Sequence, residues 1–506
     1  MLGIKKVIRV IKVIKEAILI ISITLITSST FGQANINSPY SRYGVGDLQS
    51  EGFARNLGMG GLGIGMTSPF NVNFLNPASY SSLVLTTFEG ALQGNITSLD
   101  ATGVNSTSGS TSFGYFAFGF PIKATKWGLS FGLLPYSSIG YNITDAESNS
   151  DLGNVNYTYQ GKGGINQFYV GTGYSLFKNF RVGVNASYLF GTINEVRTVA
   201  LPDNVYYFNT RTTDETTVGD FHFNFGLQYT LDSLKLSHSD SILMIRRRVV
   251  AINQEINALK DSLARCEKGL AGTAVIATVK DSIASLKRQI DAQNELKSHV
   301  LVRRARRDWS LNLGATLFLA SDIKVSKTSL TELFIYSSDG FVVVKDTAQN
   351  IAAENGVIRL PLSVGYGFTM RKGAKWLFGA DVSTQNWSDY RSFGVSDSLV
   401  NSMRYTIGAQ YTPDERSISS YLKVIQYRLG FHYDQTYLNL KNSGLNDYGV
   451  SIGFGLPMRK TLTVIHFAFE VGKMGTLVNQ LLEVNYFRFT LGLSLGDVWF
   501  LKPRVD

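Results

Sequence analysis

The chain has 506 residues, with 48 Lys and Arg against 38 Asp and Glu and a formal net charge of +10 at pH 7. It contains 49 Gly, 31 Phe and 25 Tyr but only 10 Pro, which is typical of long paired strands rather than of a disordered chain. The positive charge is confined to residues 1–34, at +4, and 232–307, at +7, which leaves −1 for the rest. Nucleic-acid binding is therefore a poor interpretation of this charge.

Residues 1–34 are typical of an export signal. Basic residues between Lys5 and Lys15 precede an apolar run, 17–27, that is too short to span a bilayer. Small residues at 32–34 offer a cleavage site, and no Cys follows it, so a lipid-anchored N-terminus is not expected. The single cysteine, Cys266, excludes an internal disulfide framework but leaves open a cross-link between two copies.

Residues 35–82 are rich in Gly, Asn and Ser and show no amphipathic period. Gly58, Gly60 and Gly63 match the dinucleotide-binding spacing G-x-G-x-x-G. That motif requires a preceding strand, a following helix and a βαβ unit, and the sequence indicates none of them. Glycines also allow backbone to pack closely inside a narrow lumen, which is the interpretation we prefer.

From residue 83 to residue 500, apolar and small or polar side chains alternate in segments of ten to twenty residues, with one interruption. In 221–230, for example, Phe221, Phe223 and Phe225 share one face of a strand, and His222 and Asn224 share the other. The number and length of the segments, the aromatic content and the small polar second face predict an all-β fold, a 14-stranded antiparallel transmembrane β-barrel. The strands are expected at 83–99, 111–122, 127–144, 154–177, 181–197, 215–231, 309–327, 355–371, 375–390, 398–412, 420–438, 445–458, 461–476 and 481–498.

The interruption, 232–307, predicts an antiparallel α-helical hairpin between strands one to six (83–231) and strands seven to fourteen (308–506). Apolar residues recur at heptad spacing from Ile242 to Leu263 and again from Val279 to Val300, on either side of a glycine-containing link. Strand parity places the hairpin in the periplasm, together with the N- and C-termini. Basic clusters flank the hairpin: Arg246, Arg247 and Arg248 at its entry, and Arg303, Arg304, Arg306 and Arg307 at its exit. They predict either an anchor on anionic headgroups or a docking post, or they only keep the helix base soluble.

Asn76, Pro77 and Ala78 come just before the first of the fourteen strands. A glycine-rich segment with this ending, in front of such a barrel, resembles the FadL family of long-chain fatty acid transporters. The resemblance covers residues 35 to about 500 except the hairpin, which departs from the family pattern. It implies that 35–82 form a hatch that plugs the barrel and carries the Asn-Pro-Ala motif. It also implies that a hydrophobic ligand binds in the lumen, shifts the hatch and leaves sideways through a gap at a kink in the third strand.

The third strand contains Pro135, which cannot donate a ladder hydrogen bond. Every strand of a closed barrel is a central strand, so Pro135 must lie at a lateral gap or at an ordinary bulge, and both interpretations stay open. Pro361, in the eighth strand, is a comparable interruption.

The alternation assigns seven ionisable side chains of later strands to the lumen. They are Arg404, Arg428, His432, Asp434, His466, Glu470 and Arg488. An inward position is expected because Arg or Lys on the lipid face near mid-membrane costs about 2–4 kcal/mol. A turn at 413–419 is expected to place Arg404 and Arg428 opposite each other, in need of an acidic partner. Asp47 and Glu51 of the hatch are candidates for an electrostatic latch; ordinary ion pairing between strands is the slightly favoured alternative.

No catalytic, metal or cofactor site is expected. His466 and Glu470, four residues apart on a strand, supply only two metal ligands, with no third in view. No nucleophile, base and orienting group come together in the sequence, so the chain is not expected to be an enzyme, and a barrel esterase lacks its Ser/His constellation.

We expect a protein of the Gram-negative outer membrane, in contact with its lipids and without a nucleic-acid partner. The leading hypothesis is passive uptake of small hydrophobic, fatty-acid-like molecules through a hatch-gated lumen. The alternative is a non-transporting scaffold or shuttle-like barrel of protein secretion or envelope assembly, which docks a periplasmic protein through the hairpin. The hairpin favours the alternative, because a diffusion channel needs no periplasmic post.

Overall fold

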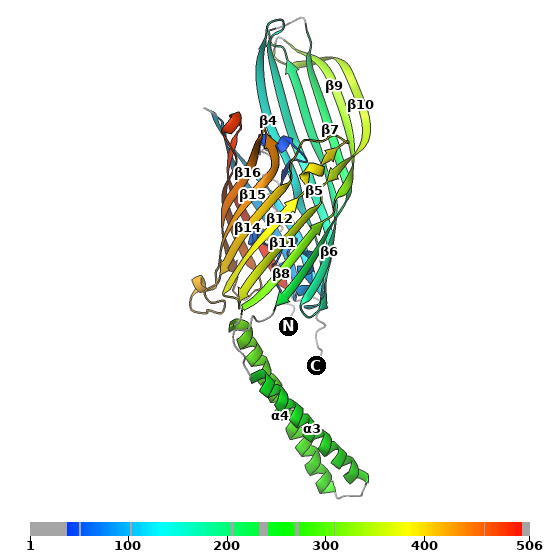
Figure 1. Ribbon diagram of the computed structural model, residues 1–506, viewed down its shortest axis with the longest axis vertical. Coiled ribbons are helices and arrows are strands. Elements are labelled where there is room, and N and C mark those ends of the chain that lie inside the picture. Colours follow the sequence, from blue (N-terminus) through cyan, green and yellow to red (C-terminus); the bar gives the residue numbers. More distant parts are fainter. Residues whose placement is uncertain are drawn as a thin grey trace, which may run out of the picture.

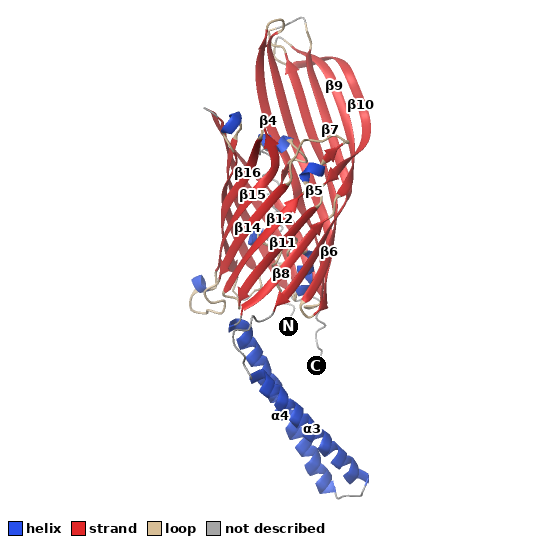
Figure 2. Cartoon of the chain, in the orientation of Figure 1, coloured by secondary structure: helices blue, strands red, loops and turns tan. Residues whose placement is uncertain are grey.

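The structure, a computed structural model, describes residues 38–49, 52–101, 104–203, 207–231, 241–268, 273–307, 309–337, 339–459 and 461–497 (Figure 1). The expected export signal lies outside these residues. The described chain is dominated by strands, with one pair of long helices projecting from one end of the sheet (Figure 2).

The strands form one antiparallel sheet that closes on itself. Strand β18 (Glu483–Asp497) pairs with β2 (Thr86–Ala101) over the full length of β18, which joins the last barrel strand to the first. Strands β8 and β9 are two halves of one barrel strand, and so are β10 and β11, so the predicted number of fourteen is confirmed. The other barrel strands are β3 (Val104–Lys123), β4 (Trp127–Asn149), β5 (Gly153–Phe177), β6 (Phe180–Ala200), β7 (Asn209–Leu231), β12 (Trp376–Gln385), β14 (Ser402–Tyr411), β15 (Gln426–Leu440), β16 (Ser443–Pro457) and β17 (Val464–Gly475).

The two interrupted barrel strands pair with each other on both sides of their breaks. Strand β10 (Val342–Leu360) pairs with β9 (Ser321–Tyr336), and β11 (Ser363–Lys372) pairs with β8 (Trp309–Phe318). On the other side only β11 pairs with β12. Pro361 lies in the break between β10 and β11, where a residue without an N–H group costs no ladder hydrogen bond.

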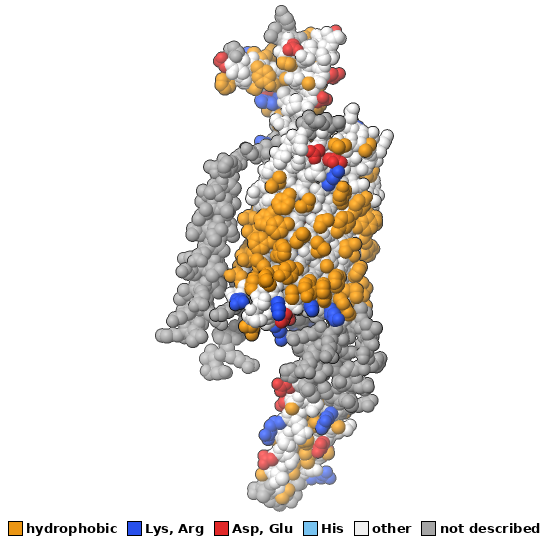
Figure 3. Space-filling view, turned by 90° about the vertical axis from the view of Figure 1, so that its left-hand side faces the viewer, with side chains coloured by type: hydrophobic (Ala, Val, Ile, Leu, Met, Phe, Trp, Pro, Cys, Tyr) orange, Lys and Arg blue, Asp and Glu red, His pale blue; other side chains and the backbone are white. Residues whose placement is uncertain are grey.

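The outer face of the barrel is apolar. On β7, Phe221 is 56% exposed and Phe223 and Phe225 are also exposed, whereas His222 and Asn224 between them are buried. Other strands also expose apolar side chains, and on the face seen in Figure 3 these side chains form a broad belt. A closed antiparallel barrel with an apolar exterior and a polar interior is the architecture of outer-membrane proteins.

The two ends of the barrel differ. The end that carries the short connections 124–126, 178–179 and 373–375 and the two long helices is called the helical end here. At the opposite, distal end, strands β4–β7, β9 and β10 continue beyond the other strands and form a curved projection, the tower (Figure 1).

Helices α3 (Ser241–Lys268) and α4 (Thr273–Arg307) pack along each other outside the barrel. Ile252 and Ile256 of α3 are buried against Ile283 and Leu286 of α4, as expected for a heptad seam. Within the described part of the chain, neither these helices nor any other has the length and apolar content needed to span a bilayer. Arg248 is exposed, while the side chains of the other predicted basic-cluster residues lie outside the described residues.

Replacing Ile256 with Asp is expected to unfold the hairpin and leave the barrel intact, because the buried seam consists of few side chains and a buried unpaired carboxylate is costly. Limited proteolysis should then cleave within 241–307, while the barrel fragment keeps its resistance to protease. The neighbouring exposed substitution Asn257→Asp should change neither result. A protease-resistant hairpin in the Ile256→Asp protein would contradict this assignment.

The described chain begins in the distal half of the lumen. The N–H of Ser38, the first described residue, donates to the carbonyl of Gly140, in the distal part of β4. The end of β18, by contrast, pairs with the start of β2 at the helical end. The prediction that both termini lie on the side of the hairpin concerns residues outside the described part of the chain and stays a prediction. Residues 38–82 lie in the lumen before the first barrel strand.

Candidate functional site

The hatch of residues 38–82 fills the lumen and consists mostly of irregular backbone. It contains strand β1 (Asp47–Leu48), helix α2 (Ala54–Leu57) and the 3-10 helices η1 (Pro39–Arg42) and η2 (Pro77–Ser82). Phe53 of the hatch stacks on Tyr115 of β3, with ring centroids 4.1 Å apart, and both side chains are buried. Irregular backbone at membrane depth is tolerated only where protein or water surrounds it, as the barrel wall does here.

Asn76 attaches the hatch to the barrel wall. Its side-chain amide donates to the carbonyls of Leu227 in β7, at 3.1 Å, and Ala315 in β8, at 3.4 Å. It also donates to the Ile64 carbonyl within the hatch at 2.8 Å, and its Oδ1 accepts from the N–H of Ala78 at 3.1 Å. The Asn-Pro-Ala motif thus starts η2, with Pro77 in the first helical position, and fixes the hatch to two strands.

Carboxylates of the wall bind backbone amides of the hatch. Asp381 of β12 accepts from the N–H groups of Gly63, at 2.7 Å, and Ile64, at 2.9 Å. On β2, the buried Glu89 accepts from the N–H of Val72 at 2.8 Å. These backbone amides would otherwise be buried in the lumen without an acceptor, so the two acids anchor the hatch.

Glycines of the wall let the hatch backbone lie directly on the strands. A Cβ atom at Gly430 of β15 would come within 3.0 Å of the main chain of Met59, and one at Gly226 of β7 would collide with Asn76. A Cβ atom at Gly183 of β6 would likewise collide with the main chain of Pro77. The wall and the hatch are therefore complementary at the level of the backbone, with no clearance between them at these positions.

Residues 38–48 form a second, apolar closure in the distal half of the lumen. The hydroxyl groups of Tyr390 and Tyr437 each donate at 2.9 Å to backbone carbonyls of this segment, those of Gly44 and Gly46. Val45, Trp387 and Tyr390 are among the most deeply buried side chains of the largest apolar cluster. The lumen is thus blocked by protein on both sides of its centre.

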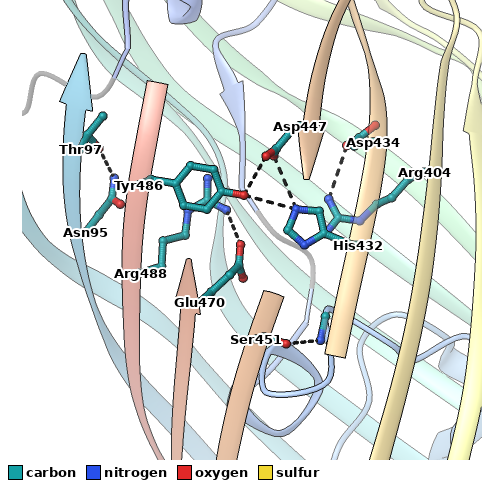
Figure 4. A network of polar contacts seen from close by, with 11 residues as sticks. Asn95, Thr97, Arg404, His432, Asp434, Asp447, Ser451, Glu470, Tyr486 and Arg488 are labelled. Atoms are coloured by element: carbon teal, nitrogen blue, oxygen red, sulfur yellow. Dashed lines mark hydrogen bonds and ion pairs between the residues drawn. The ribbon is translucent and has the colours of Figure 1, made fainter. Parts of the chain in front are cut away.

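Between these two closures lies a cavity of about 810 Å³, lined by both polar and apolar side chains. Charged side chains of β14–β18 form one of its walls (Figure 4). Hydroxyl and amide side chains from other strands and the hatch contribute much of the rest, among them Gln49, Asn95, Thr97, Ser112, Thr316 and Thr384. Apolar side chains such as Leu57, Leu75 and Phe113 line it as well, so the lining alone does not select a hydrophilic solute over an amphipathic one.

Tyr486 connects the charged side chains in this wall. Its hydroxyl donates to Asp447 Oδ1 at 2.7 Å and lies 3.3 Å from His432 Nε2 (Figure 4). The Arg488 guanidinium lies over the Tyr486 ring at 4.0 Å from the centroid, and it donates to Glu470 at 3.2 Å. Tyr486 and Asp447 were missed in the sequence, although the same alternation that selected Arg488 places Tyr486 on its face.

The structure places Arg428, His432 and His466 in the interior, each at most 3% exposed. Arg428 donates to Gln410, Gln426 and His466. Asp434, Glu470 and Arg488 line the cavity, as does Arg404. The structure does not bring His466 and Glu470 into a metal site, because no group of three or more potential ligands occurs among the described residues.

The expected register of β14 and β15 was wrong. Arg404 lies opposite Asp434, and Arg428 lies opposite Gln410, so the two arginines do not face each other. The connection between the strands runs from residue 412 to 425 and includes η4 (Tyr421–Lys423), and is longer than the expected turn at 413–419. The longer connection moves every pairing along the strands.

The described residues do not form an acidic latch between the hatch and these arginines. Arg404 pairs with Asp434 at 3.5 Å, which is ion pairing between strands. Asp47 pairs through its backbone with Ser138, and burial raises the pKa of its carboxyl to about 7 against the opposing influence of Arg488. Glu51 lies outside the described residues. The acids that hold the hatch belong to the barrel wall and accept from backbone amides of the hatch, whereas the hypothesis placed the acids in the hatch.

Replacing Arg404 with Gln is therefore expected to leave the hatch closed. The pair with Asp434 is partly exposed to the cavity and contributes at most about 1 kcal/mol. The measurement is trypsin cleavage after Arg55, a hatch residue that is only 9% exposed and is shielded while the hatch is in place. Cleavage after Arg55 in the Arg404→Gln protein, but not in the wild type, would restore the latch hypothesis.

The barrel wall is interrupted beside Pro135. The ladder between β3 and β4 ends at Phe116 and Leu133, so residues 104–115 of β3 have no partner in β4. Next to Pro135 the register of β4 with β5 shifts. Ser137 and Ser138 still pair with β5, and on the edge that β3 leaves open they pair with β1 of the hatch. A bulge and a gap thus occur together, and the cavity extends to this place, where Ser112 and Pro135 line it.

Some anchors of the hatch were not selected in the sequence. Asp381 follows the alternation of β12, where Phe378 points outward, so parity alone would have placed it in the lumen. The same parity argument would have placed Glu89 of β2 in the lumen. Their roles depend on hatch residues far away in the sequence, and no local pattern signals such a partner.

These features define a class: a fourteen-stranded membrane barrel that is closed by its own N-terminal segment and carries an external helical hairpin. The chain belongs to the BamG family, whose model matches residues 13–265 and 300–506. No curated protein matches the chain.

Solved outer-membrane channels are similar at low identity. The toluene transporter TodX of Pseudomonas putida is 14% identical with a TM-score of 0.49, over 90% of this chain and 99% of that structure. A FadL homologue of Pseudomonas aeruginosa is 8% identical with a TM-score of 0.49, over 89% of this chain and 99% of its own. Similarity at this level does not transfer a cargo from those proteins to this one.

Proposed function

We propose that this protein is a sealed outer-membrane scaffold whose helical hairpin docks a periplasmic protein. The observation that carries the proposal is the sealed lumen. Hatch backbone lies on wall glycines, wall carboxylates bind hatch amides, and an apolar closure blocks the distal half. A barrel built in this way has little use for its lumen as a passage, which leaves its outer surfaces to perform the function.

The orientation follows from the lengths of the connections. Barrels of the outer membrane have short periplasmic turns and longer external loops. The helical end has tight turns at 124–126, 178–179 and 373–375, whereas the distal end carries the tower. We therefore place the helical end and its hairpin in the periplasm and the tower outside the cell.

The hairpin is suited to reach a partner rather than to support the barrel. Helix α4 has 35 residues and, at 1.5 Å per residue, extends about 50 Å. Helix α4 contacts the barrel at β11, and its apolar seam is used between α3 and α4. Deleting the hairpin should therefore leave the barrel folded.

The test replaces residues 241–307 with a short Gly-Ser linker and compares proteins that co-purify with the two forms after mild detergent extraction. The proposal predicts a periplasmic protein in a fixed ratio to the full-length chain and its loss from the deletion variant. A matched control is Asn257→Asp, which changes an exposed hairpin residue and should keep the partner. If both forms purify with the same proteins, docking through the hairpin is wrong.

A second function, lateral passage of small molecules, is favoured by the gap beside Pro135 and by the cavity that reaches it. This is the hydrophobic uptake that the resemblance to the FadL family implied, although the charged side chains in one wall of the cavity count against a purely alkyl ligand. Equilibrium binding of radiolabelled palmitate to the purified protein tests it directly. Saturable binding that Pro135→Ala or Ser112→Trp changes would support passage, and binding no greater than to a detergent blank would exclude a fatty-acid cargo.

A further inference from the structure

The tip of the tower carries an exposed apolar patch on three neighbouring strands. The patch consists of Tyr207 and Phe208 before β7, Tyr336 at the end of β9, and Phe341, Val342, Val343 and Val344 at the start of β10. Phe341 is 72% exposed, and the three valines are 38–45% exposed although consecutive strand residues point to opposite faces. Val342 pairs with Tyr336, and Asn209 pairs with Phe334, so the members adjoin each other. We call these seven residues the tip patch.

The tip patch is separate from the membrane belt. The next exposed aromatic residue along the chain after Phe208 is Phe221 of the belt, thirteen residues later and about 43 Å away along β7. The intervening part of the tower is polar and contains the ion pairs of Asp214 with Lys327, at 3.3 Å, and of Arg211 with Glu332, at 2.7 Å. Figure 3 shows apolar side chains at the head of the molecule, above a largely polar neck. The bilayer around the belt cannot cover this patch.

Strand β10 also has a free edge beside the tip patch. It pairs with β9 from Val342 to Leu360, but on its other side the only strand paired with it in the described chain is β13 (Arg391–Ser392), at Ile358 and Arg359. No described strand therefore pairs with residues 342–356 on that side. An exposed strand edge with apolar side chains at one end is a template for another strand, and an aggregation hazard when it is uncovered.

The rim of the tip patch is acidic. Asp339 and Asp346 lie beside it and are exposed, and the described residues give neither of them a salt bridge; Lys345 is the one basic residue between 336 and 346. A complementary surface is therefore apolar at its centre and basic at its margin.

We propose that the tip patch and the free edge of β10 bind a second, extracellular protein, which adds an extended strand to β10 and places Lys or Arg side chains against the acidic rim. Backbone hydrogen bonds along the edge would supply affinity, and the apolar contacts of the tip patch would set the register. The inference uses the orientation proposed above but is independent of the periplasmic docking. It gives the scaffold one protein contact on each side of the membrane.

A second copy of this chain is a poor occupant of the same edge. Copies in one membrane point the same way, so their β10 strands run in the same direction, and antiparallel pairing between them is excluded. Their acidic rims would also face each other. The charge and the membrane geometry thus favour a different polypeptide.

The experiment compares the labelling of single cysteines by a membrane-impermeant maleimide, in intact cells and in purified full-length protein. In a Cys266→Ser background, Val343→Cys reports on the tip patch, and Ser148→Cys reports on an exposed position at the end of β4, outside the patch. The proposal predicts that Val343→Cys reacts at least ten times more slowly in cells than after purification, whereas Ser148→Cys reacts at similar rates. Asp339→Lys together with Asp346→Lys should abolish the protection of Val343→Cys.

A photo-reactive benzoylphenylalanine in place of Val344 identifies what covers the patch. One discrete adduct to a different protein, lost in the Asp339→Lys and Asp346→Lys variant, supports the proposal. Equal labelling of Val343→Cys in cells and after purification would overturn it, and so would an adduct of twice the mass of the chain. If Ser148→Cys is not labelled in cells at all, the proposed orientation is wrong, and the proposed extracellular interface is wrong as well. If only the periplasmic docking is disproved, the extracellular interface is unaffected.

Discussion

Replacing Gly430 with valine is expected to dislodge the hatch from the barrel wall. A Cβ atom at this position would come within 3.0 Å of the main chain of Met59 and Gly60. This part of the hatch lies directly on β15, so it can make room only by moving away from the barrel wall. Extra volume in a well-packed site costs about 1–3 kcal/mol, and backbone atoms yield less readily than flexible side chains. We expect the barrel itself to persist, because its ladder does not depend on the hatch at this point.

Trypsin cleavage after Arg55 measures this effect, because the residue is shielded while the hatch is seated. The Gly430→Val protein should be cleaved at least ten times faster than the wild type. Gly444→Val is the matched control, since a Cβ atom at Gly444 meets nothing within 4 Å. A Gly430→Val protein that resists trypsin as well as the control does would show that the hatch is not seated on β15.

Replacing Asn76 with alanine is expected to have the second large effect. The side chain is fully buried and makes four hydrogen bonds, two of them to carbonyls of β7 and β8. Its removal leaves buried carbonyl groups without donors and takes the cap from η2. Each lost buried partner costs about 1–3 kcal/mol and the cap about 1 kcal/mol, so the hatch should lose several kcal/mol of stability.

Thermal unfolding followed by trypsin cleavage after Arg55 measures the loss. The temperature at which the hatch becomes cleavable should fall in the Asn76→Ala protein, well before the barrel strands unfold. Asn446→Ala, at an exposed position on β16, should leave it unchanged. An unaltered cleavage temperature in the Asn76→Ala protein would mean that the motif does not anchor the hatch.

The sequence predicted the barrel because its physical cause is local. Strict alternation, as in Phe221 and His222, reports which face of each strand meets lipid, and it needs no knowledge of distant residues. The number of barrel strands and the inward positions of Arg428 and His432 follow from that rule. The heptad spacing predicted the seam of Ile252 and Ile256 for the same reason.

Features that depend on chain path and register could not be predicted in this way. The pairing of Arg404 with Asp434 depends on the length of the connection 412–425, in which no periodic pattern marks where β15 begins. The bond from Asp381 to Gly63 joins residues 318 positions apart. The direction in which residues 38–82 run through the lumen is set by contacts with many strands at once. The tower arises because several strands are longer than the alternation in the sequence indicated.

The central claim, a lumen sealed by the hatch, is tested most directly by ion conductance of the purified wild-type protein in planar lipid bilayers. The account predicts no steady conductance above the bilayer background, and discrete channels only after residues 38–82 are deleted. A wild-type protein that forms stable, long-lived channels would contradict it.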